Sequence, residues 1–381
     1  MLDNALLAEQ IKHYRKKNGL SQVELAERIN VSGQAISKWE RGVSLPELDK
    51  LCLLAELFRL SVDDLLGIAQ NHPKYMIGVD GGGSKTQMIL FDENGRTVET
   101  LLVGACNPNS IGIEAATAVL RDGITQLCRL VPRVSGVFIG ASGFATGKNG
   151  EAIRAALQGV FPHIAIGCDT DIVNVFASAG IEGDCMALIC GTGTVVCLRK
   201  NDEITRFTGW GYLLDRSGSG FHIGRDAITA ALECAEGLGA KTLLQPMLES
   251  VLGTSVRDCV KHFYANDSSY IASFAKCVFE ACEQGDFVAH QILSENAARL
   301  ANVIRRVTEQ CPTATKVIAS GSVITKNQIL REMLADGLGD RLELVLPKLS
   351  QAQGACILCA QMCGVDAATI RAAFCNQQEE R

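Results

Sequence analysis

The stretch Tyr75-Met76-Ile77-Gly78-Val79, followed by Asp80-Gly81-Gly82-Gly83-Ser84-Lys85-Thr86, decides the fold of most of this chain. A second alternating run, 87–91, follows it, so the pattern predicts two strands of a hairpin joined by a glycine turn. Three glycines leave backbone N–H groups free to converge on an anion, and Ser84, Lys85 and Thr86 add two hydroxyls and a cation. Asp80 would hold a hydrated Mg²⁺ against a bound phosphate. A plain hairpin turn with no ligand is the alternative.

Length and composition indicate a globular protein of two or three domains. The chain has 381 residues, 47% of them hydrophobic and 20% charged, and its net charge is −6. Any contact with DNA therefore requires a local basic patch. The sequence contains no apolar run of about 18 residues, and its first residues lack the apolar core of a signal peptide. These features predict a cytoplasmic protein that has no membrane partner.

Sixteen cysteines are present, and in a cytoplasmic protein we expect them to be reduced thiols. Cys356, Cys359 and Cys363 fall on one face of a predicted helix, where small residues alternate with them. A metal or iron–sulfur site takes ligands from turns and needs a fourth partner. The spacing therefore favours helix packing over metal ligation.

Residues 1–67 are predicted to form five short helices around one small core. Ser21, with Glu24 three residues later, is a capping-box pattern before the helix 22–29, and Ser32 precedes the helix 33–41. Glycines 19, 42 and 67 follow the ends of helices. Two short helices joined at Asn30-Val31 have helix-turn-helix geometry. Residues 68–74, which include Pro73, are predicted to be a polar linker.

The stretch 21–67 resembles the Cro/C1-type (XRE) DNA-binding domain along its whole length. In that family the second helix of the pair enters the major groove of double-stranded DNA. The resemblance implies that the DNA-binding residues are Gln22, Ser32, Gly33, Gln34, Ser37 and Lys38. Gln34 can bond an adenine edge bidentately, while Gln22 and Lys38 suit phosphate contacts. Gly33 stands where the family often has Arg or Gln, which removes one base contact. A helical docking module with no DNA role is the alternative.

From Tyr75 onward, strands alternate with helices in an order that occurs twice. The first series of predicted strands is 75–79, 86–91, 98–104, 134–139 and 163–168, and the second is 186–190, 195–199, 204–208, 316–319 and 342–346. Each series starts with a glycine hairpin, GGGSKT in the first and GTGT in the second. We expect an N-terminal lobe at 75–178, a C-terminal lobe at 179–349, and closing helices at 350–381 that pack back on the N-terminal lobe. Both hairpins are expected to face one phosphate chain.

The combination of DGGGSKT, GTGT, GWG followed by GSG, and a late GSV resembles the sugar-kinase/Hsp70/actin superfamily. Within it the chain resembles the BadF/BadG/BcrA/BcrD ATPase group, which contains N-acetylglucosamine kinase. The resemblance covers residues 75–364 and implies a two-lobed, actin-like α/β fold built as a duplicated ribonuclease H-like unit. It implies ATP and Mg²⁺ as cofactors, with Asp80 at the metal through water. The nucleotide-binding residues would be Gly81, Gly82, Gly83, Ser84, Lys85, Thr86, Gly191, Thr192, Gly193, Thr194, Gly321 and Ser322.

The same resemblance places an amino sugar at Asn107, Ser142, Gly143, Thr192 and Gly209, and it implies that Asp171 is the catalytic base. Asp171 lies where a predicted strand ends and a helix begins. A carboxylate there could hold the acceptor hydroxyl and take its proton during phosphoryl transfer. Two alternatives remain at this position: Asp171 as the N-cap of the helix, or Asp169 as the base.

One loop departs from the family pattern. The kinases carry Gly-Asp-Glu-Gly-Ser after GWG, and here the same positions read Asp215-Arg216-Ser217-Gly218-Ser219. Asp215 could replace the missing acid at the sugar. Alternatively, Arg216 could bind the carboxylate of an anionic sugar such as N-acetylmuramic acid, or it could be a plain surface arginine.

The predicted function is that of an ATP-dependent amino-sugar kinase fused to a DNA-binding domain, acting as a homodimer. Closure of the lobes on their ligands could change the spacing of paired DNA-binding domains, which would make the protein a sugar-responsive regulator. One alternative is a regulator whose kinase-like domain senses ligand without turnover. Another is an ATPase that activates an acyl-CoA reductase or dehydratase through a shared iron–sulfur cluster.

Overall fold

The computed structural model describes residues 4–67, 73–215 and 218–379. The described residues up to 139, together with 143–168 and 359–377, form one compact unit, and the other described residues form a second. Among the described helices, none combines the length and the apolar composition that crossing a membrane requires.

The first unit begins with five short helices, as predicted. They are α1 (Asn4–Lys17), α2 (Gln22–Arg28), α3 (Gly33–Glu40), α4 (Leu48–Phe58) and α5 (Val62–Leu65). The capping box is confirmed, because the Ser21 hydroxyl accepts the Glu24 N–H and the Glu24 carboxylate accepts the Ser21 N–H. Glycines 19, 42 and 67 have positive φ at the helix ends. Fully buried side chains fill the core: Ile11, Leu25, Ile36, Leu54 and Leu65.

A five-stranded sheet follows in the first unit, with the strand order β3-β2-β1-β4-β5. Its strands are β1 (Tyr75–Gly81), β2 (Thr86–Asp92), β3 (Thr97–Val103), β4 (Val134–Ala141) and β5 (Ala165–Asp169). β1 pairs antiparallel with β2, and β2 pairs antiparallel with β3. The predicted hairpin is therefore confirmed, with the glycines as its turn.

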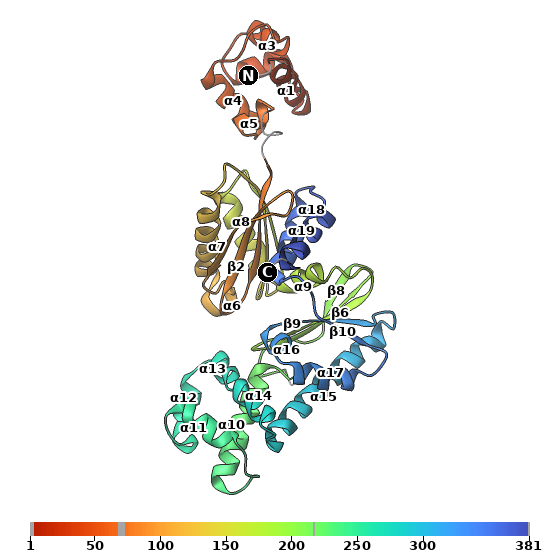
Figure 1. Cartoon of the computed structure of the whole chain (residues 1–381). Helices are drawn as coiled ribbons and strands as arrows, with labels where there is room; N and C mark the ends of the chain where they lie inside the picture. The colour runs from red at the N-terminus through yellow and green to blue at the C-terminus, as the bar shows by residue number, and fades with distance from the viewer. Residues whose placement is uncertain (1–3, 68–72, 216–217, 380–381) are drawn as a thin grey trace. The chain divides into compact units, whose positions relative to one another are not determined.

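Helices cover both faces of this sheet (Figure 1). α6 (Pro108–Ile111), α7 (Ile113–Cys128) and α8 (Asn149–Val160) follow in the chain, and α7 packs on β2 and β3. The C-terminal helix α19 (Ala367–Glu379) covers the opposite face, where the Phe374 ring lies 5.9 Å from the ring of Phe91. Its Gln377 amide also donates to the Gly95 carbonyl at 2.8 Å. α19 thus covers the face of the first sheet opposite α7.

The second unit holds a five-stranded sheet with the order β10-β9-β6-β7-β8. Its strands are β6 (Cys185–Cys190), β7 (Thr194–Lys200), β8 (Glu203–Arg206), β9 (Lys316–Ser320) and β10 (Glu343–Val345). β6, β7 and β8 form an antiparallel meander, and β9 joins β6 in parallel. In both sheets the first strand pairs with the second and lies beside the fourth, so the order of strands is repeated. This repeat agrees with the predicted duplicated α/β fold.

Helices also cover both faces of the second sheet. α9 (Asp171–Ala179) packs on the face formed by Ala187, Cys197 and Ile318. The other helices belong to the core on the opposite side, where α15 (Phe287–Gln310), α16 (Ser322–Lys326) and α17 (Gln328–Leu338) contact the strands. The remaining elements of this region are α10 (Gly220–Glu236), α11 (Leu244–Leu252), the 3₁₀ turn η2 (Val256–Cys259), α12 (Val260–Ala265), α13 (Ser268–Ser273) and α14 (Ala275–Glu283). α18 (Gln351–Met362) follows, and its residues are divided between the two units. The helical region expected at 221–310 is interrupted because glycines 237, 253 and 285 adopt positive φ.

Replacing Phe374 with alanine should destabilise the first unit by about 3–5 kcal/mol, because it leaves a cavity beside Phe91. Phe374 is 0% exposed. The loss should appear as faster amide hydrogen exchange in β1 and β2. The control is Phe287→Ala, since Phe287 is 75% exposed and its loss should change stability by no more than about 0.5 kcal/mol. Equal exchange in both variants would mean that α19 is not integral to the first unit.

Candidate functional site

The turn between β1 and β2 presents backbone and hydroxyl groups at its tip. Asp80 is opposite Gln87 and Gly81 is opposite Thr86, and the Gly82 N–H donates to the Lys85 carbonyl at 3.0 Å. A Cβ on Gly82 would lie 3.1 Å from that carbonyl oxygen. The residues at the tip, 83–85, are exposed, and Asp80 is half-buried at the end of its strand. The Thr86 hydroxyl is buried without a hydrogen-bond partner among the described residues.

Two predicted sugar-site loops meet within the first unit. Asn107 caps α6 by accepting the Asn109 N–H at 2.9 Å. Gly143 has φ of +82°, and a Cβ there would lie 2.2 Å from the Asn107 Oδ1. The Asn149 side chain donates to the Gly143 carbonyl at 3.1 Å and fixes this approach. The structure thus brings Asn107 and Gly143 together. The preceding Ser142 has a buried hydroxyl with no partner among the described residues.

The second glycine turn, GTGT, joins β6 to β7 in the second unit. The Gly191 N–H donates to the Gly193 carbonyl at 2.9 Å. The first residues of α10 approach the turn, since the Gly220 N–H donates to the Gly191 carbonyl at 2.8 Å and the Phe221 N–H donates to the Thr192 carbonyl at 3.1 Å. The positive end of the α10 dipole therefore lies against this loop, where it favours an anion.

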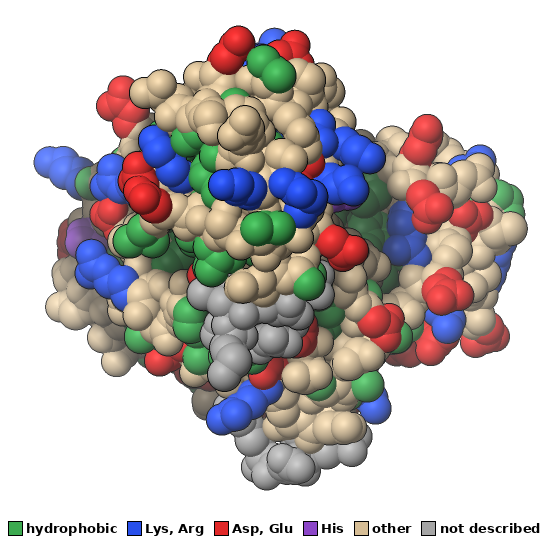
Figure 2. Space-filling view, turned by 90° about the horizontal axis from the view of Figure 1, so that it is seen from above, with side chains coloured by type: hydrophobic (Ala, Val, Ile, Leu, Met, Phe, Trp, Pro, Cys, Tyr) green, Lys and Arg blue, Asp and Glu red, His purple; other side chains and the backbone are tan. Residues whose placement is uncertain are grey.

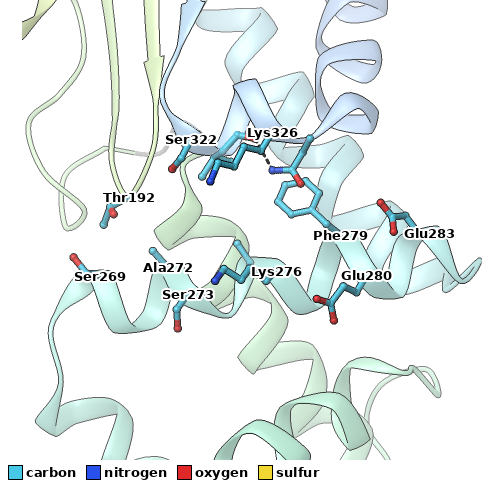
Figure 3. Close-up of a pocket in the computed structure, with 13 residues that line it drawn as sticks. Thr192, Ser269, Ala272, Ser273, Lys276, Phe279, Glu280, Glu283, Ser322 and Lys326 are labelled. Atoms are coloured by element: carbon cyan, nitrogen blue, oxygen red, sulfur yellow. Dashed lines mark hydrogen bonds between the residues drawn. The ribbon is translucent and has the colours of Figure 1, made fainter. Parts of the chain in front are cut away.

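A cavity of about 380 Å³ connects the GTGT turn to the late glycine loop (Figure 3). Thr192 and Ser322 lie at one end of it, and Glu280 and Glu283 lie at the other. Its lining residues are Thr192, Ser269, Ala272, Ser273, Ala275, Lys276, Phe279, Glu280, Glu283, Ser322, Val323, Lys326 and Asn327. Thr192 and Ser322 were predicted, whereas the residues from α13 and α14 and the other residues of α16 were not. The helical pattern alone could not show which faces of these helices line a cavity.

Gly321 fixes the position of the late glycine loop. It has φ of +94°, and a Cβ on it would lie 2.5 Å from the Cys190 carbonyl oxygen. Only glycine allows this approach between the ends of β6 and β9. Thr192, which follows β6, and Ser322, which follows β9, can therefore line the same cavity.

Asp171 is the first residue of α9, and the N-cap is Thr170. The interpretation of Asp171 as the N-cap residue is therefore wrong, although its carboxylate accepts the N–H groups of Asp171 and Ile172. Burial raises the pKa of Asp171 to about 6, against the opposing effects of these N–H groups and of the Arg206 charge. The carboxylate of Asp169 accepts the Thr170 N–H at 2.7 Å. A pKa of about 6 suits Asp171 to act as a base near neutral pH.

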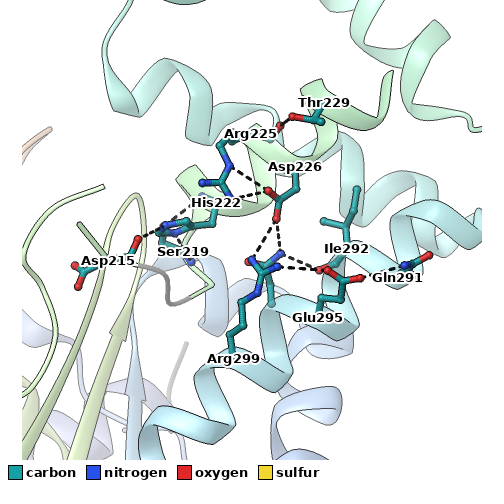
Figure 4. A network of polar contacts seen from close by, with 11 residues as sticks. Asp215, Ser219, His222, Arg225, Asp226, Thr229, Gln291, Ile292, Glu295 and Arg299 are labelled. Atoms are coloured by element: carbon teal, nitrogen blue, oxygen red, sulfur yellow. Dashed lines mark hydrogen bonds and ion pairs between the residues drawn. The ribbon is translucent and has the colours of Figure 1, made fainter. Parts of the chain in front are cut away.

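The loop after GWG is fixed by Asp215 and His222 (Figure 4). The Asp215 carboxylate accepts the N–H groups of Gly209 at 3.1 Å and Gly211 at 3.2 Å. The His222 ring contacts the Asp215 carbonyl oxygen through Nε2 at 2.7 Å and the Ser219 hydroxyl through Nδ1 at 2.7 Å. Burial lowers the pKa of His222, so the neutral ring can donate to the carbonyl and accept from the hydroxyl. Sequence reasoning missed His222.

A second cavity, of about 590 Å³, lies beside this loop and is lined by Thr208, Leu214, Asp215, His222, Arg225, Arg299, Asn302 and Val303. Its two arginines are already paired. Arg225 contacts Asp226 at 2.7 Å, and Arg299 contacts Glu295 at 3.4 Å. Arg216, the predicted partner of an anionic sugar, lies outside the described residues, as does Ser217.

The N-terminal helices present the predicted DNA-binding residues on α2 and α3. Gln34 and Lys38 are exposed on α3, while Ile36 and Trp39 face the core. Ser32 caps α3 by accepting the Ala35 N–H, and Gly33 and Ser37 are half-buried. Gln22, at the start of α2, donates to the Glu40 carboxylate at 2.7 Å. Lys and Arg side chains lie among exposed hydrophobic side chains on the face shown in Figure 2.

An ion pair joins α1 to α3. The Arg15 Nε lies 2.5 Å from the Glu40 Oε1, and the two side chains are 11% and 4% exposed. The pairing with Arg15 and Gln22 holds the pKa of Glu40 below its ordinary value although burial acts to raise it. Since Gln22 shares the same carboxylate, this pair also orients the first residue of α2.

The cysteines are free thiols in the structure. Cys356 and Cys359 are fully buried on α18, and Cys363 is half-buried. Within the described ranges, no group of three His, Cys, Asp or Glu side chains could hold a metal ion. The burial of Cys356 and Cys359 on α18 is consistent with the expected packing role.

Comparison with known proteins matches two separate stretches of the chain. Residues 77–359 match the model of the BadF/BadG/BcrA/BcrD ATPase family, and residues 11–65 match a helix-turn-helix model. The N-acetylmuramic acid/N-acetylglucosamine kinase of Clostridium acetobutylicum is 29% identical over 308 residues, which cover 76% of this chain and 99% of that kinase. The HTH-type transcriptional regulator ImmR of Bacillus subtilis is 38% identical over 61 residues, 16% of this chain and 48% of the regulator.

A solved structure shares the fold of the larger part. The ROK family glucokinase from Streptomyces griseus, in complex with glucose and AMPPNP, has a TM-score of 0.56 and 18% identity. The match covers 75% of this chain and 99% of that one. At this identity the likeness concerns the fold alone.

Replacing Glu40 with alanine should destabilise the N-terminal helices by about 3–5 kcal/mol, because Arg15 is left nearly buried without its carboxylate. Amide hydrogen exchange of α1 and α3 in the full-length protein measures this loss. The control is Asp122→Ala, since Asp122 pairs with Arg121 but is 68% exposed and its loss should cost no more than about 1 kcal/mol. Unchanged exchange in α1 and α3 of the Glu40 variant would contradict the prediction.

Proposed function

The chain belongs to the BadF/BadG/BcrA/BcrD ATPase family and carries an N-terminal helix-turn-helix domain, and from this premise we propose that it is an ATP-dependent amino-sugar kinase that also binds DNA. The kinase from Clostridium acetobutylicum, which this chain matches over 99% of its length, supports an amino sugar as the acceptor. The observation that carries the proposal is that Thr192 and Ser322 line the same cavity. The family pattern assigns the two loops that carry these residues to the nucleotide.

The adenosine of ATP would occupy this cavity. Phe279 offers an apolar surface to the base, and Glu280 and Glu283, at the end away from the GTGT turn, can accept hydrogen bonds from ribose hydroxyls. The phosphates would then extend toward Thr192 and the N-terminus of α10. Lys276 and Lys326 line the same cavity and supply positive charge. These residues suit a nucleotide better than a neutral ligand.

The residues at the first glycine turn fit a magnesium phosphate. A Cβ at position 82 would lie 3.1 Å from the Lys85 carbonyl oxygen, and glycine leaves that space open. The hydroxyl of Thr86 is buried and has no partner among the described residues. Mg²⁺ is commonly bound by one or two carboxylates together with water and substrate phosphates, and we propose Asp80 as that carboxylate. When bound, Mg²⁺ would neutralise charge on the transferred phosphoryl group.

Asn107, Ser142 and Gly143 are proposed to hold the sugar, with Thr192, Gly209 and Asp215 as further contacts. The buried Ser142 hydroxyl supports this assignment because it lacks a partner among the described residues. Asp215 already accepts two backbone N–H groups, so we propose that it acts on the sugar mainly by holding Gly209 in place. N-Acetylglucosamine and N-acetylmuramic acid are the acceptors to compare, with Arg216 as the proposed partner of the acid group of the second.

Asp171 is proposed to take the proton of the acceptor hydroxyl. The acceptor oxygen forms a bond to the γ-phosphorus while the bond from that phosphorus to the β–γ bridging oxygen breaks, and ADP leaves. Because Asp171 follows a strand end and starts a helix, two backbone N–H groups fix its carboxylate.

The N-terminal domain is proposed to bind double-stranded DNA through α3. Helix-turn-helix domains commonly act in pairs on two half-sites, so we propose a homodimer. Ligand binding to the kinase domain would then alter the spacing of the paired domains, and the protein would be a sugar-responsive regulator. The placement of Gln34 and Lys38 on the exposed side of α3 supports the DNA-binding part of this proposal.

A coupled assay of ADP release with N-acetylglucosamine and with N-acetylmuramic acid tests the kinase proposal. The wild-type protein should turn over at least one of them with MgATP. Asp171→Asn should lower kcat by at least about 100-fold, since general base catalysis contributes roughly 10²–10⁴, and should leave ATP binding unchanged by calorimetry. Unchanged turnover in this variant would remove Asp171 from the role of base. ATP binding without turnover of either sugar in the wild type would instead favour a ligand-sensing regulator.

The pKa of Asp171 sets the pH dependence of kcat/KM in the proposed kinase reaction. A base must be ionised to accept a proton, and a carboxyl whose pKa is raised to about 6 loses its ionised form as the pH falls through that value. We expect kcat/KM to decline below about pH 6, rather than near pH 4 as for an ordinary aspartate. A pH profile of kcat/KM, measured with saturating MgATP, shows the pH at which this decline begins. A decline that starts only near pH 4 would contradict the assignment.

Mobility-shift assays on DNA from upstream of its own coding sequence test the DNA-binding part. Gln34→Ala should weaken binding to the preferred site by about 1–3 kcal/mol and relax its sequence preference, whereas Lys38→Ala should weaken binding to all sequences alike. Gln245→Ala, on a helix of the second unit, is the control and should bind as the wild type does. Absence of binding at low salt would reject the DNA-binding role. An affinity unchanged by MgATP and sugar would reject only the regulatory coupling.

A further inference from the structure

The His222 ring joins the loop after GWG to the start of α10 (Figure 4). Its Nε2 lies 2.7 Å from the Asp215 carbonyl oxygen, and its Nδ1 lies 2.7 Å from the Ser219 hydroxyl oxygen. A carbonyl oxygen can only accept, so in the neutral ring Nε2 carries the proton and Nδ1 accepts the Ser219 hydroxyl. Both His222 and Ser219 are buried. One shielded ring therefore holds Asp215 against the N-cap of α10.

Asp215 in turn fixes Gly209 and Gly211. Its carboxylate accepts the N–H groups of both glycines, and its own N–H donates to the Gly211 carbonyl at 2.9 Å. The two glycines have φ of +92° and +96°, and glycine has access to many other backbone conformations. The conformation of this loop therefore depends on Asp215, and the position of Asp215 depends on His222.

The start of α10 is itself bound to the second glycine turn. The Gly220 N–H donates to the Gly191 carbonyl at 2.8 Å, and the Phe221 N–H donates to the Thr192 carbonyl at 3.1 Å. His222 follows these two residues on the first turn of α10. A continuous series of hydrogen bonds thus runs from the GTGT turn through His222 to the loop after GWG, entirely within the second unit.

We propose that His222 is a positioning residue for the acceptor sugar, which acts through Asp215 to hold Gly209 in a fixed position relative to the GTGT turn. The inference rests on the proposed function for the contact between Gly209 and the sugar. A loop that is already ordered before the ligand arrives loses less conformational entropy on binding. Loss of the hydrogen bond from Nε2 should therefore weaken the binding of the sugar.

The cavity beside this loop makes substitutions at His222 informative. Asp215 and His222 both line it, so water can reach the Asp215 carbonyl when the N–H of the ring is removed. Water satisfies a carbonyl oxygen nearly as well as a direct hydrogen bond does. A variant that lacks the N–H should therefore fold, and it should lose mainly the fixed position of the loop.

His222→Gln and His222→Met test this inference, because the two new side chains are equal in length and only glutamine carries an amide donor. Glutamine at the third position of a helix can also accept the N–H of Ser219, as in a capping box. His222→Met should raise the KM for the accepted sugar at least about fivefold, the effect of losing one hydrogen bond of ordinary strength. His222→Gln should restore most of the wild-type value, and the KM for MgATP should be unchanged in both variants.

His290→Gln is the matched control, because His290 is exposed on α15. Its KM for the sugar should equal that of the wild type. Equal KM values for the sugar in His222→Gln and His222→Met would show that the donor does not hold the loop, and they would overturn the inference. A fall in kcat accompanied by equal rises of both KM values in His222→Met would indicate a merely structural role and would also overturn it.

A second measurement separates this inference from the proposed function. Amide hydrogen exchange of residues 209–215 in the protein without ligand should be faster in His222→Met than in the wild type, His222→Gln and His290→Gln. Exchange in β6 and β7 should stay as in the wild type. If the wild type turns over no sugar, the kinase proposal fails while this measurement still decides whether His222 fixes the loop. Equal exchange of residues 209–215 in all four proteins, or faster exchange throughout the second unit of His222→Met, would overturn the inference.

Discussion

The close approach of Gly321 to the Cys190 carbonyl is the constraint on which the second unit depends. It brings the ends of β6 and β9 so near to each other that a side chain at 321 would collide with backbone. Because of this approach, the loops that follow the two strands share one cavity. The Gly220 N–H binds the Gly191 carbonyl in the same region and fixes the start of α10. Two strand ends and one helix start thus define the place where a nucleotide would lie.

Most of the fold could be predicted from the sequence because its signals are local. Alternating apolar runs located all ten strands to within a few residues, and serine caps and glycine stops located the short N-terminal helices. β5 begins at Ala165 rather than at 163, because the residues before it form a turn. The repeated strand order could be predicted because each hairpin carries its own glycine motif.

The site was only partly predictable, since several of its residues depend on packing between distant segments. Asp171 could be named from the family pattern, but its pKa of about 6 arises from burial that no local pattern reveals. Phe279 and Lys276 line the cavity that Thr192 and Ser322 also line, and they come from a helix whose sequence signals only its amphipathic character. His222 could have been suspected, because the pattern Ser-x-x-His places a ring at the third position of a helix whose cap is Ser219.

The path of the chain through α19 has a consequence for biosynthesis. The Thr97 hydroxyl donates to the Gln377 side chain across 280 positions, and the face of β2 that carries Phe91 is covered by Phe374. A ribosome therefore releases β1, β2 and β3 long before the helix that shields them has been translated. During that interval the nascent first sheet exposes an apolar face, to which chaperones can bind. A polypeptide terminated before residue 367 would keep that face uncovered, so premature termination near the end of the message would yield an aggregation-prone product.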